Sequence, residues 1–295
     1  MSNYLKLWIM GGLLSLSVII AKQLIVAGIN PIYLAMLQAT GSIVFLASFG
    51  TTGVIENLRR NVSYYLLAST LGFTIPQLVV FYSVEYVGAS VAALAYAFPL
   101  FITFFLSHLV SSSKVERKAL IYMLGAFSGS LLYLYKPDVM LFDSNQMGWL
   151  FVLCLAPITL SIANIYRSRY WPADTPIYHV ALLTNVFSFG SYLLLAAFTT
   201  PVLPDYSILS YSVYAAILVF MLIAGIGQYL LFSLQKGATP SFVGQTGSIT
   251  AFCGGALGFL FFQESYQLTT FLGSLLIIVG VAGFSRQQDL EHSRL

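Results

Sequence analysis

The stretch YSILSYSVYAAILVFMLIAGIGQYLLFSLQ, residues 206–235, contains no Asp, Glu, Lys, Arg or His. A helix needs about 20 apolar residues to cross the hydrocarbon core of a bilayer. The backbone of a spanning segment cannot leave its polar groups unpaired in lipid, and a helix pairs them within the segment. This stretch is therefore predicted to be a transmembrane helix.

The composition of the whole chain also indicates a membrane protein. Of its 295 residues, 58% are hydrophobic and 8% are charged, whereas a soluble domain carries about 25% charged residues. Most of the exterior must therefore face lipid. The net charge of +3 does not indicate nucleic-acid binding, because the basic residues lie in short clusters between apolar runs. Cys154 and Cys253 lie in separate apolar runs without a CxxC motif, so no redox site, metal or cofactor is predicted.

Similar runs recur along the chain and predict an all-α integral membrane protein with ten spans. The apolar run after the short basic N-terminus is interpreted as the first span and not as a signal peptide, because a second apolar segment begins at Pro31. The predicted spans are residues 7–27, 31–50, 63–84, 88–110, 117–136, 148–168, 177–199, 211–235, 239–262 and 267–285.

The distribution of Lys and Arg predicts that both termini are cytoplasmic. Cytoplasmic loops of membrane proteins carry an excess of these residues. With the N-terminus inside, only Lys22 and Lys136 of the 13 basic residues fall outside. The other 11 fall in inside segments: Lys6, Arg59, Arg60, Lys114, Arg117, Lys118, Arg167, Arg169, Lys236, Arg286 and Arg294.

The chain also repeats itself weakly. An offset of 151 places Gln77 on Gln228 and Phe81 on Phe232, and an offset of 148 places Gly125 on Gly273. Each half has five predicted spans, an odd number, so the second half must enter the membrane inverted relative to the first. Inverted repeats of this kind place a substrate site near the bilayer midplane, between the halves. The predicted domains are a first repeat at 1–140, a second at 141–286 and a cytoplasmic tail at 287–295.

Two matching blocks, 84–135 and 230–283, resemble the EamA family of the drug/metabolite transporter superfamily. The family pattern is a small-residue turn, an apolar helix with Pro, a Glu-Arg pair and a helix with Gly near its start. The matching residues are Val87-Gly88-Ala89-Ser90, Pro99, Glu116-Arg117 and Gly125 in the first half, and Ala238 to Ser241, Glu264 and Gly273 in the second. Thr250 stands where the first half has Pro99, so any kink is not expected to be symmetric.

The resemblance implies a central cavity lined by spans 3, 4, 8 and 9, with contributions from spans 1 and 6. Polar side chains at membrane depth usually face the bundle interior or a watery cavity. Gln77 and Gln228 lie at matching points of the repeats, and each offers a donor and an acceptor to a solute. The alternative interpretation is that they hold helices together by hydrogen bonds.

Further residues are candidates for the cavity wall, each with helix packing as the alternative. The polar and aromatic candidates are Tyr82, Tyr96, Gln245, Ser248, Asn164, Gln38 and Lys22. Pro99, Gly244 and Gly247 are candidate hinges. Lys22 either extends toward the outer interface or attracts a substrate carboxylate at the cavity mouth.

Together these features predict a secondary transporter of small polar metabolites, amino acids or related compounds, that exports them across a bacterial inner membrane as a monomer or homodimer. Uptake of choline or another quaternary ammonium compound is the alternative, since aromatic rings bind such cations. A cavity with three or more rings and no basic residue would favour choline. A non-transporting scaffold or lipid-handling subunit would lack a solvent-connected cavity. No motif of an enzyme is present in the sequence.

Overall fold

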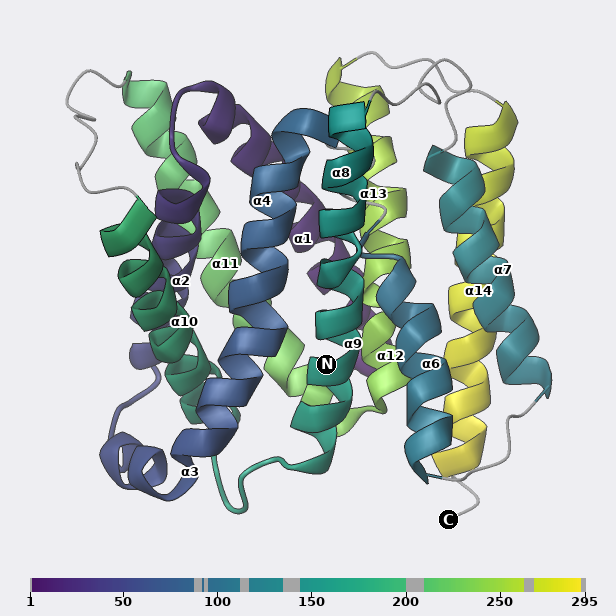
Figure 1. The fold of residues 1–295 in the computed structure, drawn as a ribbon. Coiled ribbons are helices and arrows are strands. Elements are labelled where there is room, and N and C mark those ends of the chain that lie inside the picture. The colour runs from purple at the N-terminus through teal and green to yellow at the C-terminus, as the bar shows by residue number, and fades with distance from the viewer. Residues whose placement is uncertain are drawn as a thin grey trace.

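The computed structural model describes residues 2–87, 92, 95–111, 117–134, 144–199, 210–262 and 268–292. The regular secondary structure of these residues is entirely helical (Figure 1). The helices of the first half are α1 (Asn3–Val26), α2 (Pro31–Ala47), α3 (Val54–Ser69), the π-helix η1 (Thr70–Thr74), α4 (Ile75–Val87), α6 (Phe98–Ser111) and α7 (Arg117–Leu134). Those of the second half are α8 (Ser144–Leu153), α9 (Leu155–Arg169), α10 (Ile177–Thr199), α11 (Tyr211–Gly237), α12 (Pro240–Gly244), α13 (Thr246–Phe262) and α14 (Leu268–His292).

These elements form ten helical stretches in the described parts of the chain, one for each predicted span. Five of the stretches are long and apolar enough to cross a membrane: 3–26, 54–87, 146–169, 177–199 and 211–237. Shorter apolar helices lie at 31–47, 98–107 and 271–284. The helix α14 continues to His292, so residues 287–292 extend the last helix.

Turn chemistry explains where α1 ends and α2 begins. Gly28 has a φ of +93°, a left-handed conformation that glycine adopts without steric cost and that commonly ends a helix. The N–H of Ile29 then donates to the carbonyl of Leu24 at 3.0 Å. The Asn30 side chain accepts from the N–H of Ile32 at 3.0 Å, and Pro31 follows as the first helical residue. This Asn-Pro pair is a strong helix start.

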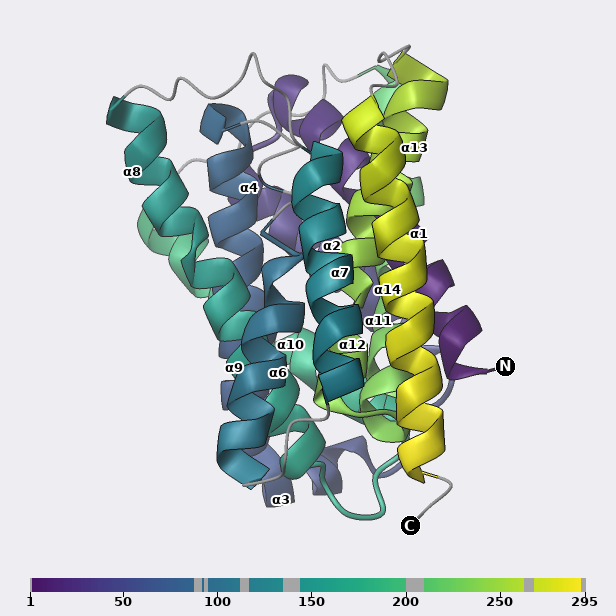
Figure 2. The same ribbon diagram turned by 90° about the vertical axis from the view of Figure 1, so that its right-hand side faces the viewer.

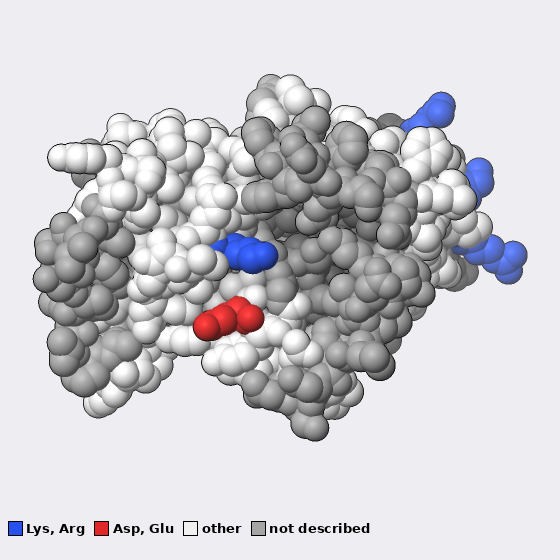
Figure 3. Space-filling model, turned by 90° about the horizontal axis from the view of Figure 1, so that it is seen from above, with Lys and Arg blue, Asp and Glu red and all other residues white. Residues whose placement is uncertain are grey.

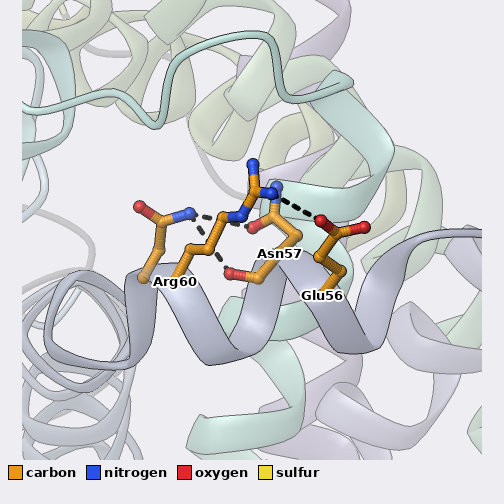
Figure 4. Close-up of polar contacts among 4 residues, drawn as sticks. Glu56, Asn57 and Arg60 are labelled. Atoms are coloured by element: carbon orange, nitrogen blue, oxygen red, sulfur yellow. Dashed lines mark hydrogen bonds and ion pairs between the residues drawn. The ribbon is translucent and has the colours of Figure 1, made fainter.

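The start of α3 is an exposed polar segment. Arg60 and Glu56 lie one turn apart and form an ion pair at 2.5 Å, with side chains 74% and 68% exposed (Figure 4). Exposed pairs of this kind stabilise a helix by only about 0.3–0.5 kcal/mol. The helix is kinked at Asn61, whose φ and ψ are −130° and 28°. The predicted span 63–84 begins directly after this kink.

Proline interrupts the helices at specific points. Pro76 has no N–H to donate to the carbonyl of Gly72, four residues earlier, and the chain forms the π-helical turn η1 at this place. Pro157 has the same relation to Leu153, and α8 ends there. Pro99, a candidate hinge, lies at the second position of α6, where proline begins a helix and does not kink one.

The helices of the two halves pack in matching pairs. The second helices of the halves, α2 and α10, contact each other, as do the last helices, α7 and α14. Figures 1 and 2 both show α7 and α14 side by side at one edge of the bundle. Their colours show that they run in opposite directions, because α7 ends at the level at which α14 begins (Figure 1).

Buried hydrophobic side chains fill the spaces between the helices. Large apolar side chains also cover the outside, such as Phe198 at 80% exposed and Leu218 at 67% exposed. This outer apolar surface suits lipid. Among the fully buried side chains of the described residues, the largest is that of Arg167.

Glycine allows a close approach between the halves. A Cβ atom on Gly247 of α13 would lie 1.4 Å from the carbonyl oxygen of Tyr96, which belongs to the turn before α6. No side chain fits at that position without moving the backbone of the other half.

We expect Gly247→Ala to lower the free energy of unfolding by about 1–3 kcal/mol or more, because the added methyl group overpacks this contact. Gly12→Ala is the control, since nothing lies within 4 Å of a Cβ there. The unfolding temperatures of both variants in detergent measure the difference. Equal stability of the two variants would contradict the close approach.

Candidate functional site

A cavity of about 110 Å³ lies between the two halves of the bundle. One buried water needs only about 10–15 Å³, so the space can hold a small solute. Its wall comes from α1, α2, η1, α4 and α6 of the first half, with the turn at 95–97, and from α9, α11, α12 and α13 of the second half. The polar side chains of the wall are Ser17, Gln38, Gln77, Tyr96, Asn164, Arg167, Gln228 and Thr246.

Most of the residues that the sequence singles out lie at this cavity. Those in the wall are Gln77, Gln228, Tyr96, Asn164 and Gln38, with the candidate hinges Pro99, Gly244 and Gly247. The wall includes members of all six spans that the family resemblance implies, and Gln38 adds the second span.

Four candidates are not among the residues that line the cavity. Tyr82 donates through its hydroxyl to the Asn30 side chain at 3.5 Å, next to the start of α2. Gln245 and Ser248 are fully buried beside the break between α12 and α13. Lys22 is exposed near the end of α1.

Figure 3 shows the end of the bundle that lies at the top of Figure 1. A basic and an acidic group lie near the centre of that face in Figure 3. The helices α1 and α4 end on this side (Figure 1) and carry the exposed residues Lys22 and Glu85. The motif residues Gly88, Ala89, Ser90, Glu116 and Glu264, and also Lys136, lie outside the described residues.

Interrupted helices form part of the cavity wall. Gly72 and Phe73 belong to the π-helical turn η1, and Pro76, which causes this turn, also lines the cavity. In the other half, α12 ends at Gly244 and α13 begins at Thr246. Both of these residues face the cavity. Non-helical backbone at membrane depth is tolerated where it lines a cavity.

The wall contains one feature that the sequence analysis misplaced. Arg167, which we counted among the cytoplasmic loop charges, is 1% exposed and lies in the cavity wall. It is the one charged residue among the described residues that line the cavity. Without Arg167, the predicted orientation places ten basic residues in inside segments and two outside. Asn164 lies three residues earlier on the same helix, so the two side chains share one face of that helix. This spacing within a predicted span was the signal in the sequence that could have placed Arg167 beside Asn164.

Two polar contacts fix the Arg167 guanidinium. Its Nε donates to the carbonyl of Ala163 at 3.2 Å, and its Nη2 donates to Oδ1 of Asn164 at 3.3 Å. Gln235 of α11 also approaches this pair. In one orientation its amide donates to Oδ1 of Asn164 at 3.3 Å; in the opposite orientation its oxygen accepts from Nη2 and Nε of Arg167 at 3.2 and 3.3 Å.

Aromatic rings and a glycine enclose the same guanidinium. Its central carbon lies 4.9 Å from the ring centre of Phe73 and 5.6 Å from that of Phe232, distances at which a cation is attracted to the ring. A Cβ on Gly72 would lie 2.9 Å from the guanidinium. The absence of a side chain at position 72 therefore leaves room for Arg167.

Some polar atoms of the wall are buried without a protein partner. They are Nη1 of Arg167 and the side-chain oxygens of Gln38 and Gln228. Buried polar groups are normally hydrogen-bonded. In the described part of the chain the ion pair joins Arg60 to Glu56, and no carboxylate pairs with Arg167. These groups without a protein partner offer one cationic donor and two amide oxygens to a bound molecule.

Known proteins provide a further comparison. Residues 4–135 match the model of the EamA-like transporter family. A solved structure described only as "Crystal structure of protein" matches with a TM-score of 0.76 and 16% identity, covering 96% of this chain and 98% of its own. At this identity the match shows the fold alone. No curated protein matches the sequence.

We expect Asn164→Ala to lower the free energy of unfolding by about 1–3 kcal/mol, because the variant loses a hydrogen bond to a buried charge. Thr159→Ala is the control on the same helix. The Thr159 hydroxyl donates only to carbonyls of its own helix, those of Leu155 and Ala156. Chemical or thermal unfolding in detergent compares the two variants, and an Asn164→Ala protein as stable as the control would contradict the role of Asn164.

Proposed function

We propose that the chain is a member of the EamA-like transporter family, whose model matches residues 4–135, and that it is a secondary transporter of amino acids or related small polar metabolites. Members of this family are membrane transporters and not enzymes. On this proposal the chain is a multi-pass membrane protein that carries out membrane transport, in agreement with its helices that are long and apolar enough to cross a membrane. We assign export across a bacterial inner membrane, by a monomer or homodimer.

The observation that carries the proposal is the cavity between the halves. Both halves contribute polar side chains to its wall, and the matched pair Gln77 and Gln228 lies there together. Ligand sites are concave and mostly apolar, with a few placed polar groups. The proposed path of the solute passes through this cavity, which opens to one side and then to the other as the halves rock against each other.

The helix contacts support the inverted repeat on which alternating access depends. Beyond α2 with α10 and α7 with α14, several of the contacts between the halves have a counterpart with the halves exchanged. The contact of α2 with α11 corresponds to that of α10 with α3, and the contact of α1 with α13 to that of α9 with α6. The contact of α1 with α11 corresponds to that of α9 with α4. Such reciprocity is expected if 1–140 and 141–286 are related by a two-fold axis.

The wall argues for a metabolite with an acidic or amide group over a quaternary amine. Phe73 and Tyr96 are the aromatic residues among the described residues of the wall, and Arg167 is a basic one. Choline carries a fixed positive charge, which the Arg167 guanidinium would repel. The cavity also argues against a scaffold, which has no need for unpaired polar groups around an internal space.

Gln228→Ala is expected to reduce solute binding and flux, because it removes a buried amide from the cavity wall. A thermal-shift screen of the purified protein against amino acids, choline-type amines and nucleosides identifies a ligand. At 100 times its dissociation constant, a ligand stabilises the fold by about 2.7 kcal/mol. Proteoliposomes then measure flux.

Gln146→Ala is the matched control for this experiment, since Gln146 lies at the start of α8, outside the cavity wall. A ligand whose thermal shift and flux are the same in Gln228→Ala as in this control would place the solute elsewhere. An absence of binding and flux for every compound would contradict the transport proposal and support the scaffold.

The proposed orientation, with both termini in the cytoplasm, predicts opposite labelling of Lys22→Cys and Arg59→Cys. Both native side chains are exposed, and they lie on opposite sides of the bilayer under the positive-inside rule. In intact cells, a membrane-impermeant maleimide should label position 22 and not position 59, in a background with Cys154 and Cys253 replaced by Ser. Labelling of position 59 alone would invert the orientation.

A further inference from the structure

The charge of Arg167 is the feature that the transport proposal leaves unexplained. The side chain is 1% exposed in a bundle whose described residues place no carboxylate against it. A buried charge is unfavourable unless it is paired and hydrogen-bonded. Two of its nitrogens are fixed by Ala163 and Asn164, whereas Nη1 has no protein partner.

Helix packing alone does not account for this arrangement. An apolar residue would fill the space between Phe73 and Phe232 without the loss of hydration that a buried cation suffers. A Cβ added to Gly72 would lie 2.9 Å from the guanidinium, so the glycine at this position leaves room for the charged group. The guanidinium is thus held in one position, in the wall of the cavity, with one nitrogen available.

We propose that Arg167 binds the carboxylate of the transported solute, an inference that rests on the proposed transport function. Arginine forms strong charge-assisted hydrogen bonds to carboxylates. Arg167 supplies one positive charge, and the described wall holds no other charged group. A carboxylate matches that charge, whereas a phosphate ester with two negative charges would leave one of them buried and unpaired.

The two glutamines of the wall, Gln38 and Gln228, suit a second group of the solute. The side-chain oxygens of Gln38 and Gln228 are buried acceptors without a protein partner. They suit a solute that carries a hydrogen-bond donor, such as an ammonium group. Leu13, Leu14 and Ile223 form an apolar part of the wall. The solute class is therefore a small amino acid with an uncharged side chain.

The test compares Arg167→Gln with Arg169→Gln, an exposed arginine two residues further along the same helix. The probes are L-alanine, L-leucine and L-phenylalanine, each with its carboxamide, in which the carboxylate is replaced by a neutral amide. Calorimetry in detergent gives the affinities, and proteoliposomes give the flux of each probe. Inorganic phosphate serves as a competitor of different geometry and charge.

The wild-type protein and Arg169→Gln should bind at least one of the acids about tenfold to a hundredfold more tightly than its amide, as expected for a hydrogen bond to a charged group. In Arg167→Gln this preference should disappear. Arg167→Lys, which keeps the charge, should retain part of it. A purely structural arginine would lower the unfolding temperature without changing the ratio of acid to amide affinity.

Three results would overturn the inference: amides that bind the wild type as tightly as the acids, an unchanged preference in Arg167→Gln, or phosphate that competes as well as the acids. If these occur while any probe shows flux above that of empty liposomes, the transport proposal stands without the inference. If no probe binds or moves, both fail. Should Arg167→Gln not fold, Gly72→Ala replaces it, since the added methyl group displaces the guanidinium, and it should also weaken the preference.

Discussion

The absence of water from the bilayer core decides where this chain can depart from a regular helix. An interrupted helix frees backbone N–H and C=O groups, which lipid cannot satisfy. The π-helical turn at Gly72 and the break at Gln245 both border the cavity between the halves. The interruption between α8 and α9 is different, since the N–H of Cys154 still donates to the carbonyl of Leu150 at 3.1 Å. The π-helical turn and the break between α12 and α13 thus both lie next to the cavity.

The cavity is also where side chains depart from the apolar rule. Polar side chains from four helices lie around this one space: Gln38 of α2, Gln77 of α4, Asn164 and Arg167 of α9, and Gln228 of α11. Asn164 and Gln235 hold the guanidinium from two helices of the same half. The single positive charge of this guanidinium and the mostly apolar wall around it limit which solutes can bind in the cavity.

The proposed repeat accounts for the arrangement of the helices, but it does not account for the burial of Arg167. Lys22 and Arg167 each lie nine residues before a proline, Pro31 and Pro176, so they occupy matching positions in the two halves. Lys22 is exposed and Arg167 is buried. Under the proposed alternating access, such a difference between matching residues is expected of a single conformation, because only one side of the central site is open at a time.

Most of the fold could be predicted from the sequence, because the cost of unpaired backbone in lipid turns each apolar run into a helix. The runs located the helical stretches, and the offset of Gln77 and Gln228 brought forward two residues that share the cavity. Helix periodicity could not show that Tyr82 contacts Asn30, or that Gln245 and Ser248 lie outside the cavity wall.

The burial of Arg167 was decided only by the tertiary structure. In the sequence it stands beside Arg169 at the end of a span and reads as a loop charge, because local composition records no distance to other helices. Its environment depends on Gly72 and Phe73 from η1 and on Phe232 and Gln235 from α11, which are distant in the chain. The sequence by itself determined that the chain crosses a membrane as helices; packing of those helices decided which charge they enclose.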